Sequence, residues 1–336
     1  KSKIMRDNER KLEIIEGGQN IMNYTEIRAY TGQPEYSKRF WNAMRGQESY
    51  YAELSKGRNS ETGTYNLPNS TSNQYEAALV KESLFRNIGS TFRVYDGAYH
   101  ILAKYYDDLA QFIPEGGSIP IFDGLNDFTT YPVESNKLAA LVKLSSDFVN
   151  DTAFDIESYL VNRLAKNFAK AEDNAFINGT GVQMPVGILN DTNGAEVAHS
   201  VDEITYDNII NLYFSVKPEY RKNAIWLMND KTALALRTMK DEVGNYLWRN
   251  NDDTILGKKV MISEFMPDME SGAKPIAFGD FSHYWIINRS PVSVKALSEK
   301  FALYDQIGYL AFEFIDGKLI RPEAVKVIKI NTLNND

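Results

Sequence analysis

One long amphipathic stretch, from Asp155 to Ile177, constrains the fold of this chain more than any other segment. Its apolar residues recur every three or four positions, the spacing that places one face of a helix against a core. They are Ile156, Leu160, Leu164, Phe168, Ala171 and Ala175. Asp155 is a favourable N-cap for such a helix. At about 1.5 Å per residue the helix would be about 35 Å long, which predicts a strut around which a domain is organised.

The charged positions of the same stretch predict a second helix face that is in contact with solvent. They are Glu157, Lys166, Lys170, Glu172 and Asp173. Asn178-Gly179 then predicts the end of the helix, because glycine adopts the left-handed conformation of a C-terminal cap at low cost.

Composition and charge exclude several classes of function. The chain has 336 residues, which suggests two domains, and it carries a net charge of −8. Such a chain lacks the basic excess of a general nucleic-acid binder. Cysteine is absent, which excludes disulfides, thiolate chemistry and cysteine-based zinc sites. No apolar run approaches the ~20 residues of a membrane span, and no apolar leader is present, so a cytosolic product is expected. Because the first residue is Lys1, we expect a processed or trimmed start.

Two segments before the long helix have the composition of extensions. Residues 1–21 are dense in charge and predict the tail of a helical leader, or equally a mobile polar terminus. Residues 56–73 are rich in Gly, Asn, Ser and Thr, which predicts an extended arm. Such an arm has little reason to be ordered in a monomer, so we expect it to lie on another subunit.

An acidic excursion separates the first helices from the long one. Residues 105–136 contain six acidic residues and no Lys or Arg, and Asp123-Gly124 is a hairpin signal. A two-stranded hairpin is marginally stable alone in water. The pattern therefore predicts a projecting loop that needs a partner surface; the alternative is an ordinary surface hairpin on its own domain.

Strands and short helices alternate around and after the long helix. We expect strands at 138–144, 224–228, 256–262 and 275–281, and helices at 206–214 and after a cap at Asn229 or Asp230. Residues 284–330 are rich in strand signals. They include a predicted hairpin at Asp316-Gly317 and a final strand, 324–330, with one solvated face.

The sequence contains no constellation that predicts catalysis, a cofactor or a metal site. His100, His199 and His283 are scattered, and none is at metal-ligand spacing from another. No nucleophile elbow or phosphate-binding loop is present. The adjacent acids Asp107-Asp108 and Asp252-Asp253 could hold a hard cation, but acids in polar loops are usually solvated. A monomeric soluble enzyme is therefore a poor explanation of this chain.

The order of these motifs resembles the major capsid proteins of tailed bacteriophages of the Hong Kong 97 type. The exit from the long helix, Asn178-Gly179-Thr180-Gly181 followed by Pro185-Val186-Gly187-Ile188-Leu189, matches that family. The segments 224–228, 256–260 and 276–281 match its compact domain, and the resemblance covers about residues 60–330. It implies an α+β fold with an N-arm, an E-loop hairpin, a peripheral P-domain with a long spine helix, and an axial A-domain.

The resemblance also implies domain boundaries. Residues 1–75 would be the N-terminal region and N-arm, and 106–137 the E-loop. The P-domain would comprise 76–105, 138–188 and 283–336, with its spine helix at 155–177, and the A-domain 189–282. The family assembles as pentamers and hexamers into an icosahedral shell around double-stranded DNA. This implies a virion protein of a phage or prophage, assembled in the bacterial cytoplasm, with portal, scaffold and maturation-protease partners and no membrane. Residues 105–136 lack Lys, so we predict no isopeptide cross-link from this loop.

Contacts between subunits are the functional sites that such a protein requires. We expect the acidic hairpin, through Glu115, Asp123 and Asp127, to dock on a neighbouring P-domain. The candidate cations there are Arg289, Lys295 and Lys300. Because the chain is acidic, we expect DNA to be retained by enclosure rather than by tight binding. The alternative is an encapsulin-like compartment that carries cargo enzymes, although the long region 1–75 favours a virus.

Overall fold

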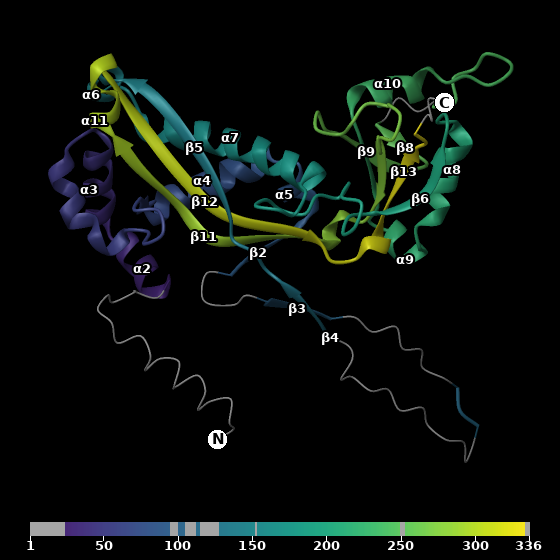
Figure 1. Ribbon diagram of the computed structural model, residues 1–336, viewed down its shortest axis with the longest axis horizontal. Coiled ribbons are helices and arrows are strands. Elements are labelled where there is room, and N and C mark those ends of the chain that lie inside the picture. The colour runs from purple at the N-terminus through teal and green to yellow at the C-terminus, as the bar shows by residue number, and fades with distance from the viewer. Residues whose placement is uncertain are drawn as a thin grey trace.

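The computed structural model describes residues 24–94, 100–104, 112–114, 128–151, 153–248 and 253–332. They form an elongated molecule with one sheet in each half (Figure 1). The predicted leader 1–21 lies outside the described residues, as do the Asp123-Gly124 turn and most of the acidic excursion.

The long helix forms where the sequence predicts it. Helix α7 spans Ile156–Asn178, and the side chain of Asp155 caps it by accepting a hydrogen bond from the Ser158 N–H at 3.1 Å. The expected left-handed end at Gly179 is wrong, because its φ is −61°. A Cβ on Gly179 would lie 2.1 Å from the Pro185 carbonyl oxygen, so glycine is required there by close backbone approach.

A five-stranded sheet lies against this helix. Its long strands are β11 (Tyr284–Leu297), β12 (Gln306–Leu319) and β5 (Asn136–Ser145), with β1 (Tyr65–Asn66) beside β11 and β2 (Ser90–Arg93) parallel to it. Val142, Tyr309 and Val294 pack in one core with the apolar stripe of α7. The predicted hairpin at Asp316-Gly317 is wrong. Both residues lie inside β12, and Gly317 pairs with Ile286. The connection from β11 to β12 is instead made by α11 (Ser298–Phe301) and η4 (Ala302–Tyr304).

A six-stranded sheet forms the other half, in the order β6-β13-β10-β7-β9-β8. Its strands are β6 (Glu196–Val201), β7 (Ile225–Met228), β8 (Thr254–Ile255), β9 (Lys258–Ile262), β10 (Ile276–Gly279) and β13 (Val325–Ile330). The helices of this half are α8 (Tyr206–Ser215), α9 (Pro218–Arg221) and α10 (Asp230–Thr238), the last capped by Asn229. The resemblance implied that residues 283–336 belong to the same domain as the long helix. Strand β13 departs from this grouping, because it pairs with β10 and β6 of the second sheet.

The N-terminal segments pack on the first sheet of their own chain. They are α2 (Tyr24–Thr31), α3 (Pro34–Met44), η1 (Glu48–Gly57), α4 (Asn69–Glu82) and α5 (Phe85–Ile88). The expectation that residues 56–73 need another subunit for order is wrong. Leu67 is buried and its N–H donates to the Val292 carbonyl at 3.2 Å, and Thr64 Oγ1 donates to Ser293 Oγ at 2.7 Å. A few buried side chains therefore order residues 56–73, although their composition is typical of a loop.

Strands β3 (His100–Lys104) and β4 (Phe128–Pro132) pair antiparallel and lie beyond β2 in Figure 1. Strand β3 directly precedes the acidic excursion and β4 lies in its last third, so the segment between them begins and ends on paired strands.

Candidate assembly surfaces and the polar network that supports them

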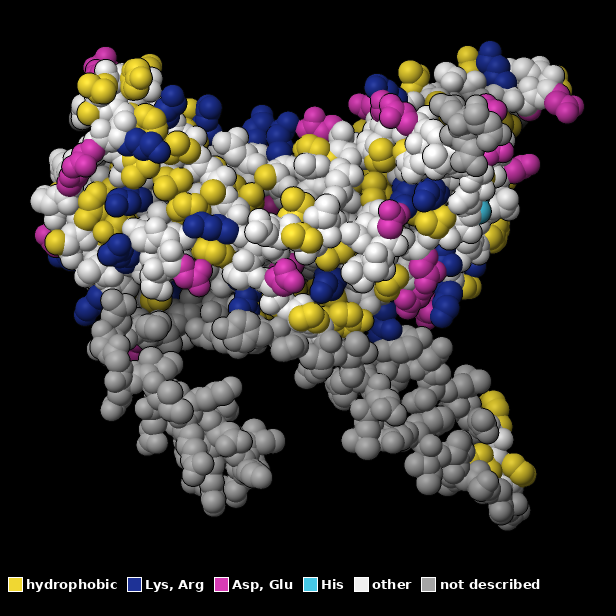
Figure 2. Space-filling model, in the orientation of Figure 1, with side chains coloured by type: hydrophobic (Ala, Val, Ile, Leu, Met, Phe, Trp, Pro, Cys, Tyr) yellow, Lys and Arg dark blue, Asp and Glu magenta, His cyan; other side chains and the backbone are white. Residues whose placement is uncertain are grey.

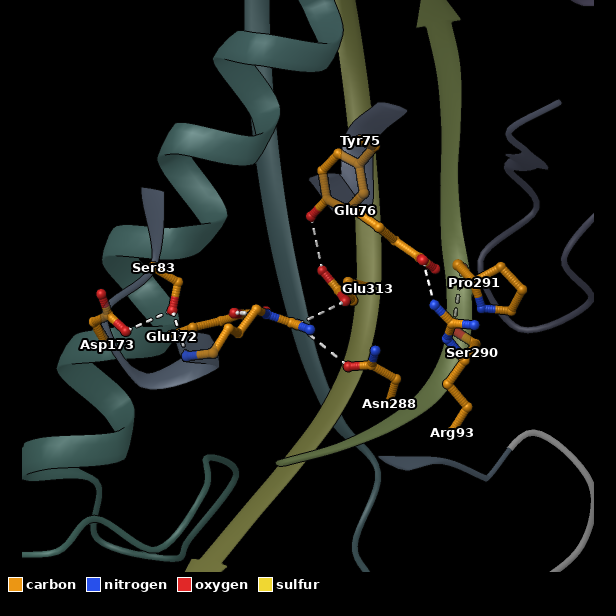
Figure 3. A network of polar contacts seen from close by, with 11 residues as sticks. Tyr75, Glu76, Ser83, Arg93, Glu172, Asp173, Asn288, Ser290, Pro291 and Glu313 are labelled. Atoms are coloured by element: carbon orange, nitrogen blue, oxygen red, sulfur yellow. Dashed lines mark hydrogen bonds and ion pairs between the residues drawn. The ribbon is translucent and has the colours of Figure 1, made fainter. Parts of the chain in front are cut away.

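A buried ionic network joins α7 to the neighbouring helices and to the first sheet (Figure 3). The Arg86 guanidinium donates two hydrogen bonds to the Glu172 carboxylate, each 2.7 Å long. It also lies 3.4 Å from Glu313 Oε1 and donates to Asn288 Oδ1 at 3.2 Å. Tyr75 donates to the other Glu313 oxygen at 2.9 Å. The network thus connects α4, α5 and α7 to β11 and β12 on the side of the sheet that α7 covers.

The predicted solvent exposure of Glu172 and Asp173 is wrong, because only 2% and 6% of their surfaces are accessible. Asp173 accepts hydrogen bonds from Ser83 Oγ at 2.7 Å, the Leu84 N–H at 2.8 Å and the Phe85 N–H at 3.0 Å. These bonds stabilise the non-helical turn between α4 and α5. The apolar pattern of this segment resembles that of one continuous helix. Burial raises the pKa of Asp173 despite the three donors, which lower it.

The network holds two carboxylates and one guanidinium in a low-dielectric site. Burial raises the pKa of Glu313 to about 8, helped by the nearby Glu172 charge and opposed by Arg86. Burial also lowers the pKa of Arg86, but Glu172 and Glu313 raise it overall, so the guanidinium stays charged. A proton held by the carboxylate pair leaves the buried group close to neutral.

Both ends of the acidic excursion are fixed to the first sheet. On the outgoing side Arg289 Nη1 donates to the Val94 carbonyl at 3.2 Å, and Arg93 forms an ion pair with Glu76. On the returning side Asp316 accepts from the Glu134 N–H at 2.8 Å, and Tyr131 donates to the Ile320 carbonyl at 3.1 Å. The half-buried Arg289, expected to contact a neighbour, therefore engages the root of its own loop.

The sheet has an open face on the side opposite α7. Lys295, Leu310 and Leu141 are register partners across three strands and share this face. Lys137 lies over the Phe312 ring at 4.2 Å, and Lys143 over the Phe301 ring at 5.6 Å. Leu141 is 45% exposed. Figure 2 shows hydrophobic and basic side chains interspersed over this half of the molecule.

The strand positions that build this face carry no Asp or Glu. They are 137, 139, 141, 143 and 145 of β5, 308, 310, 312 and 314 of β12, and 293, 295 and 297 of β11. We name them the open sheet face. Of the predicted cations, Lys295 belongs to it and lies 5.9 Å from the Tyr51 ring centre. Lys300 lies at its edge on α11, exposed and 5.8 Å from the Phe301 ring centre. Sequence reasoning missed Lys137 and Lys143, although their alternation along 137–143 indicates a common face.

The expected partners of these cations, Glu115, Asp123 and Asp127, lie outside the described residues. Their docking stays a prediction.

Within the described ranges, no cluster of three or more potential metal-ligating side chains occurs. His199 and His283 are apart: burial lowers the pKa of His199, and His283 packs edge-on against Tyr220 at 5.2 Å. Asp253 pairs with Arg237 at 2.7 Å, whereas Asp107, Asp108 and Asp252 are not described. No helix in the described part has the length and apolar character to cross a bilayer.

Comparison with known proteins identifies relatives of this arrangement. The model of the phage capsid family matches residues 63–330. The capsid of a native GTA particle is 30% identical, with a TM-score of 0.62, and the match covers 76% of this chain and 90% of that one. The capsid of an empty GTA particle is also 30% identical, with a TM-score of 0.64 and coverage of 75% and 90%. The capsid-like fold recurs in a structure from Gordonia phage Cozz at 14% identity and a TM-score of 0.54, covering 75% and 87%. No curated protein matches the chain.

Proposed function

Because this chain belongs to the phage capsid family, we propose that it assembles as pentamers and hexamers into an icosahedral shell that encloses double-stranded DNA. The chain is a structural capsid protein of the Hong Kong 97 type. The observation that carries the proposal is the match over 90% of a particle-forming capsid chain at 30% identity. Portal, scaffold and protease partners and assembly in a host cytoplasm belong to the same proposal.

We assign the parts of the fold to roles in this shell. The five-stranded sheet with α4 and α7 forms the peripheral domain, and the six-stranded sheet, β13 included, forms the axial domain around the five-fold and six-fold axes. The excursion between β3 and β4 is the E-loop. The N-terminal region up to about residue 75 remains the N-arm, although its described part packs on its own subunit.

The open sheet face is the docking site for the E-loop of a second copy. The face combines half-buried Leu310 and Phe312 with Lys137, Lys143 and Lys295, and its strand positions carry no acid. Residues 105–136 carry six acids with no basic residue and contain Phe112, Ile119 and Ile121. Charge and apolar character are therefore complementary, and a face with an apolar centre and charged positions is typical of a protein interface.

Expression of the chain, followed by negative-stain electron microscopy, tests the proposal. We expect closed particles with capsomers of five and six copies, and nuclease-resistant DNA when packaging proteins are present. Particles that contain protein cargo and no DNA would instead support the encapsulin-like compartment. A 38.2 kDa monomer under every condition would contradict both.

A further inference from the structure

The solvent face of α7 is free of acidic side chains. Its exposed positions carry only cations and amides, namely Asn162, Arg163, Lys166, Asn167, Lys170, Asn174 and Asn178, apart from Ser158 near the start. The acids of the helix point elsewhere. Glu172 and Asp173 are buried in the network, and the half-buried Glu157 accepts a hydrogen bond from Thr71. In a chain of net charge −8, this is a marked segregation of charge.

Helix α4 continues this surface. It runs parallel to α7, since Thr71 contacts Glu157 near the start and Ser83 contacts Asp173 near the end. Its exposed positions are Ser70, Asn73, Gln74, Ala77, Val80, Lys81 and Glu82. We name the exposed positions of both helices the α4–α7 face.

The exposed acids at this face lie at its two ends: Asp155 precedes the start of α7, whereas Glu82 and Glu264 lie at the end nearest the second sheet. Glu82 ends α4, and Glu264 pairs with Lys170 at 2.9 Å while both remain exposed. Away from that end, Arg163 donates to the Tyr159 hydroxyl at 3.0 Å. Among the described residues, neither Arg163 nor Lys166 forms an ion pair with a carboxylate. Figure 2 shows basic side chains along the upper edge of the molecule, over α7.

The chemistry of the α4–α7 face differs from that of the open sheet face. The open sheet face has exposed and half-buried apolar side chains, as a protein partner requires. The α4–α7 face is almost entirely hydrophilic and offers Lys, Arg, Asn and Gln donors. These groups, with water between them, are the ones that contact phosphate oxygens of nucleic acids without reading sequence.

The two faces lie on opposite sides of the subunit, because the buried stripe of α7 packs on the inner face of the sheet. If neighbouring loops cover the open sheet face, the α4–α7 face is directed to the other side of the shell wall. We infer that the α4–α7 face lines the interior of the shell and binds the phosphate backbone of enclosed double-stranded DNA. This inference rests on the proposed function. It implies that DNA is retained by many weak contacts with the shell, and not by enclosure alone.

The spacing of the cations suits this role. Arg163, Lys166 and Lys170 follow one another along the helix, and the first and last are seven positions apart, about 10 Å. One DNA strand presents a phosphate about every 3.4 Å along the axis, so three cations can face neighbouring phosphates. Each subunit contributes a few contacts, and repetition over the shell makes them effective without strong binding by one copy.

The test compares R163Q/K166Q/K170Q with a control that loses the same charge, K217Q/K222Q/K259Q, taken from exposed lysines of the second half. Binding of a fluorescent duplex of about 30 bp to the unassembled protein is measured by anisotropy between about 50 and 200 mM salt. For the α7 variant we expect the slope of log K against log salt to become shallower by about 2 to 3, because each phosphate that is no longer neutralised changes this slope by about 0.9. The control should keep the wild-type slope.

Electron microscopy of the same three proteins separates this inference from the proposed function. Equal slopes for the two variants, or no wild-type binding at about 50 mM salt, would overturn the inference while shells still form. A folded α7 variant that fails to form shells, while the control assembles, would identify the face as a protein contact and also overturn it. Failure of the wild type to form particles would instead contradict the proposed function.

Discussion

Arg86 and Glu172, which are 86 residues apart in the sequence, face each other in a two-bond ion pair with both contacts at 2.7 Å. Side chains of both are almost fully buried, at 3% and 0% exposure. The pair attaches the α4–α5 corner to the C-terminal half of the long helix, and Glu313 and Asn288 attach it to the sheet. The faces assigned to neighbours and to DNA therefore share one internal support.

Replacement of Arg86 by Met should strongly destabilise the protein. It leaves Glu172 and Glu313 buried without a cation, which costs about 3–5 kcal/mol when one partner of a buried pair is removed. Thermal unfolding measures the effect. The matched change is Arg163→Met, whose side chain is exposed and for which less than about 1 kcal/mol is expected. Similar melting temperatures for the two variants would show that the network contributes little.

The pH dependence of stability should change in E313Q. Because the pKa of Glu313 is raised to about 8 in the folded state, against about 4.3 when unfolded, the folded protein holds a proton that the unfolded chain releases. Its contribution is complete below about pH 4 and is lost as the pH rises through 8. The wild type should therefore lose stability relative to E313Q between pH 5 and about 8, which melting curves across this range will measure. A constant difference would argue against the buried proton.

Gly179→Ala should be poorly tolerated although the backbone there is extended. Its Cβ would meet the Pro185 and Ala175 carbonyl oxygens at 2.1 and 2.3 Å, and backbone atoms move at high cost. We expect a loss of about 1–3 kcal/mol or more in denaturant unfolding. Gly244→Ala is the control, because it has a φ of +89° but no neighbour within 4 Å. A greater loss at Gly244 would mean that dihedral strain outweighs close approach.

Charge reversal should reveal the docking of the acidic loop. D123K/D127K should lower the yield of assembled particles, most at low salt, because exposed charge pairs are screened as salt rises. Adding K137E/K143E/K295E should restore part of the yield, because these changes reverse the charge of the open sheet face as well. Sedimentation velocity provides the measurement, and K217E/K222E/K259E in the same background is the control. Unchanged assembly of D123K/D127K would count against this contact.

Purified particles boiled in SDS should run as monomers. The loop stretch 105–136 contains no Lys, so its side chains cannot supply the amine of an isopeptide bond. Ladders of covalent multimers on a gel would refute this expectation.

Local patterns in the sequence were sufficient for the elements that frame the fold. The apolar spacing and the Asp155 cap predict α7, and alternation predicts β5, because each depends on neighbours within a few residues. The lysines of the open sheet face were accessible to the same reasoning, since 137 and 143 share the parity of an exposed strand face.

Other features depend on contacts between residues that are distant in the chain. The charges of Glu172 and Asp173 predicted that both side chains face solvent. Both are instead buried, because Arg86 and Ser83 of another segment donate hydrogen bonds to them. Tyr75 donates in the same way to the buried Glu313. Asp316-Gly317 has the composition of a turn, yet it continues β12 and pairs with Ile287 and Ile286 of β11. The Glu134 N–H and the Asn136 side chain donate to the buried Asp316 carboxylate. Likewise β13 joins the second sheet through pairing with β10 and β6. Periodicity reports which face of an element is apolar, whereas the partner that covers a polar side chain becomes known only when the chain is folded.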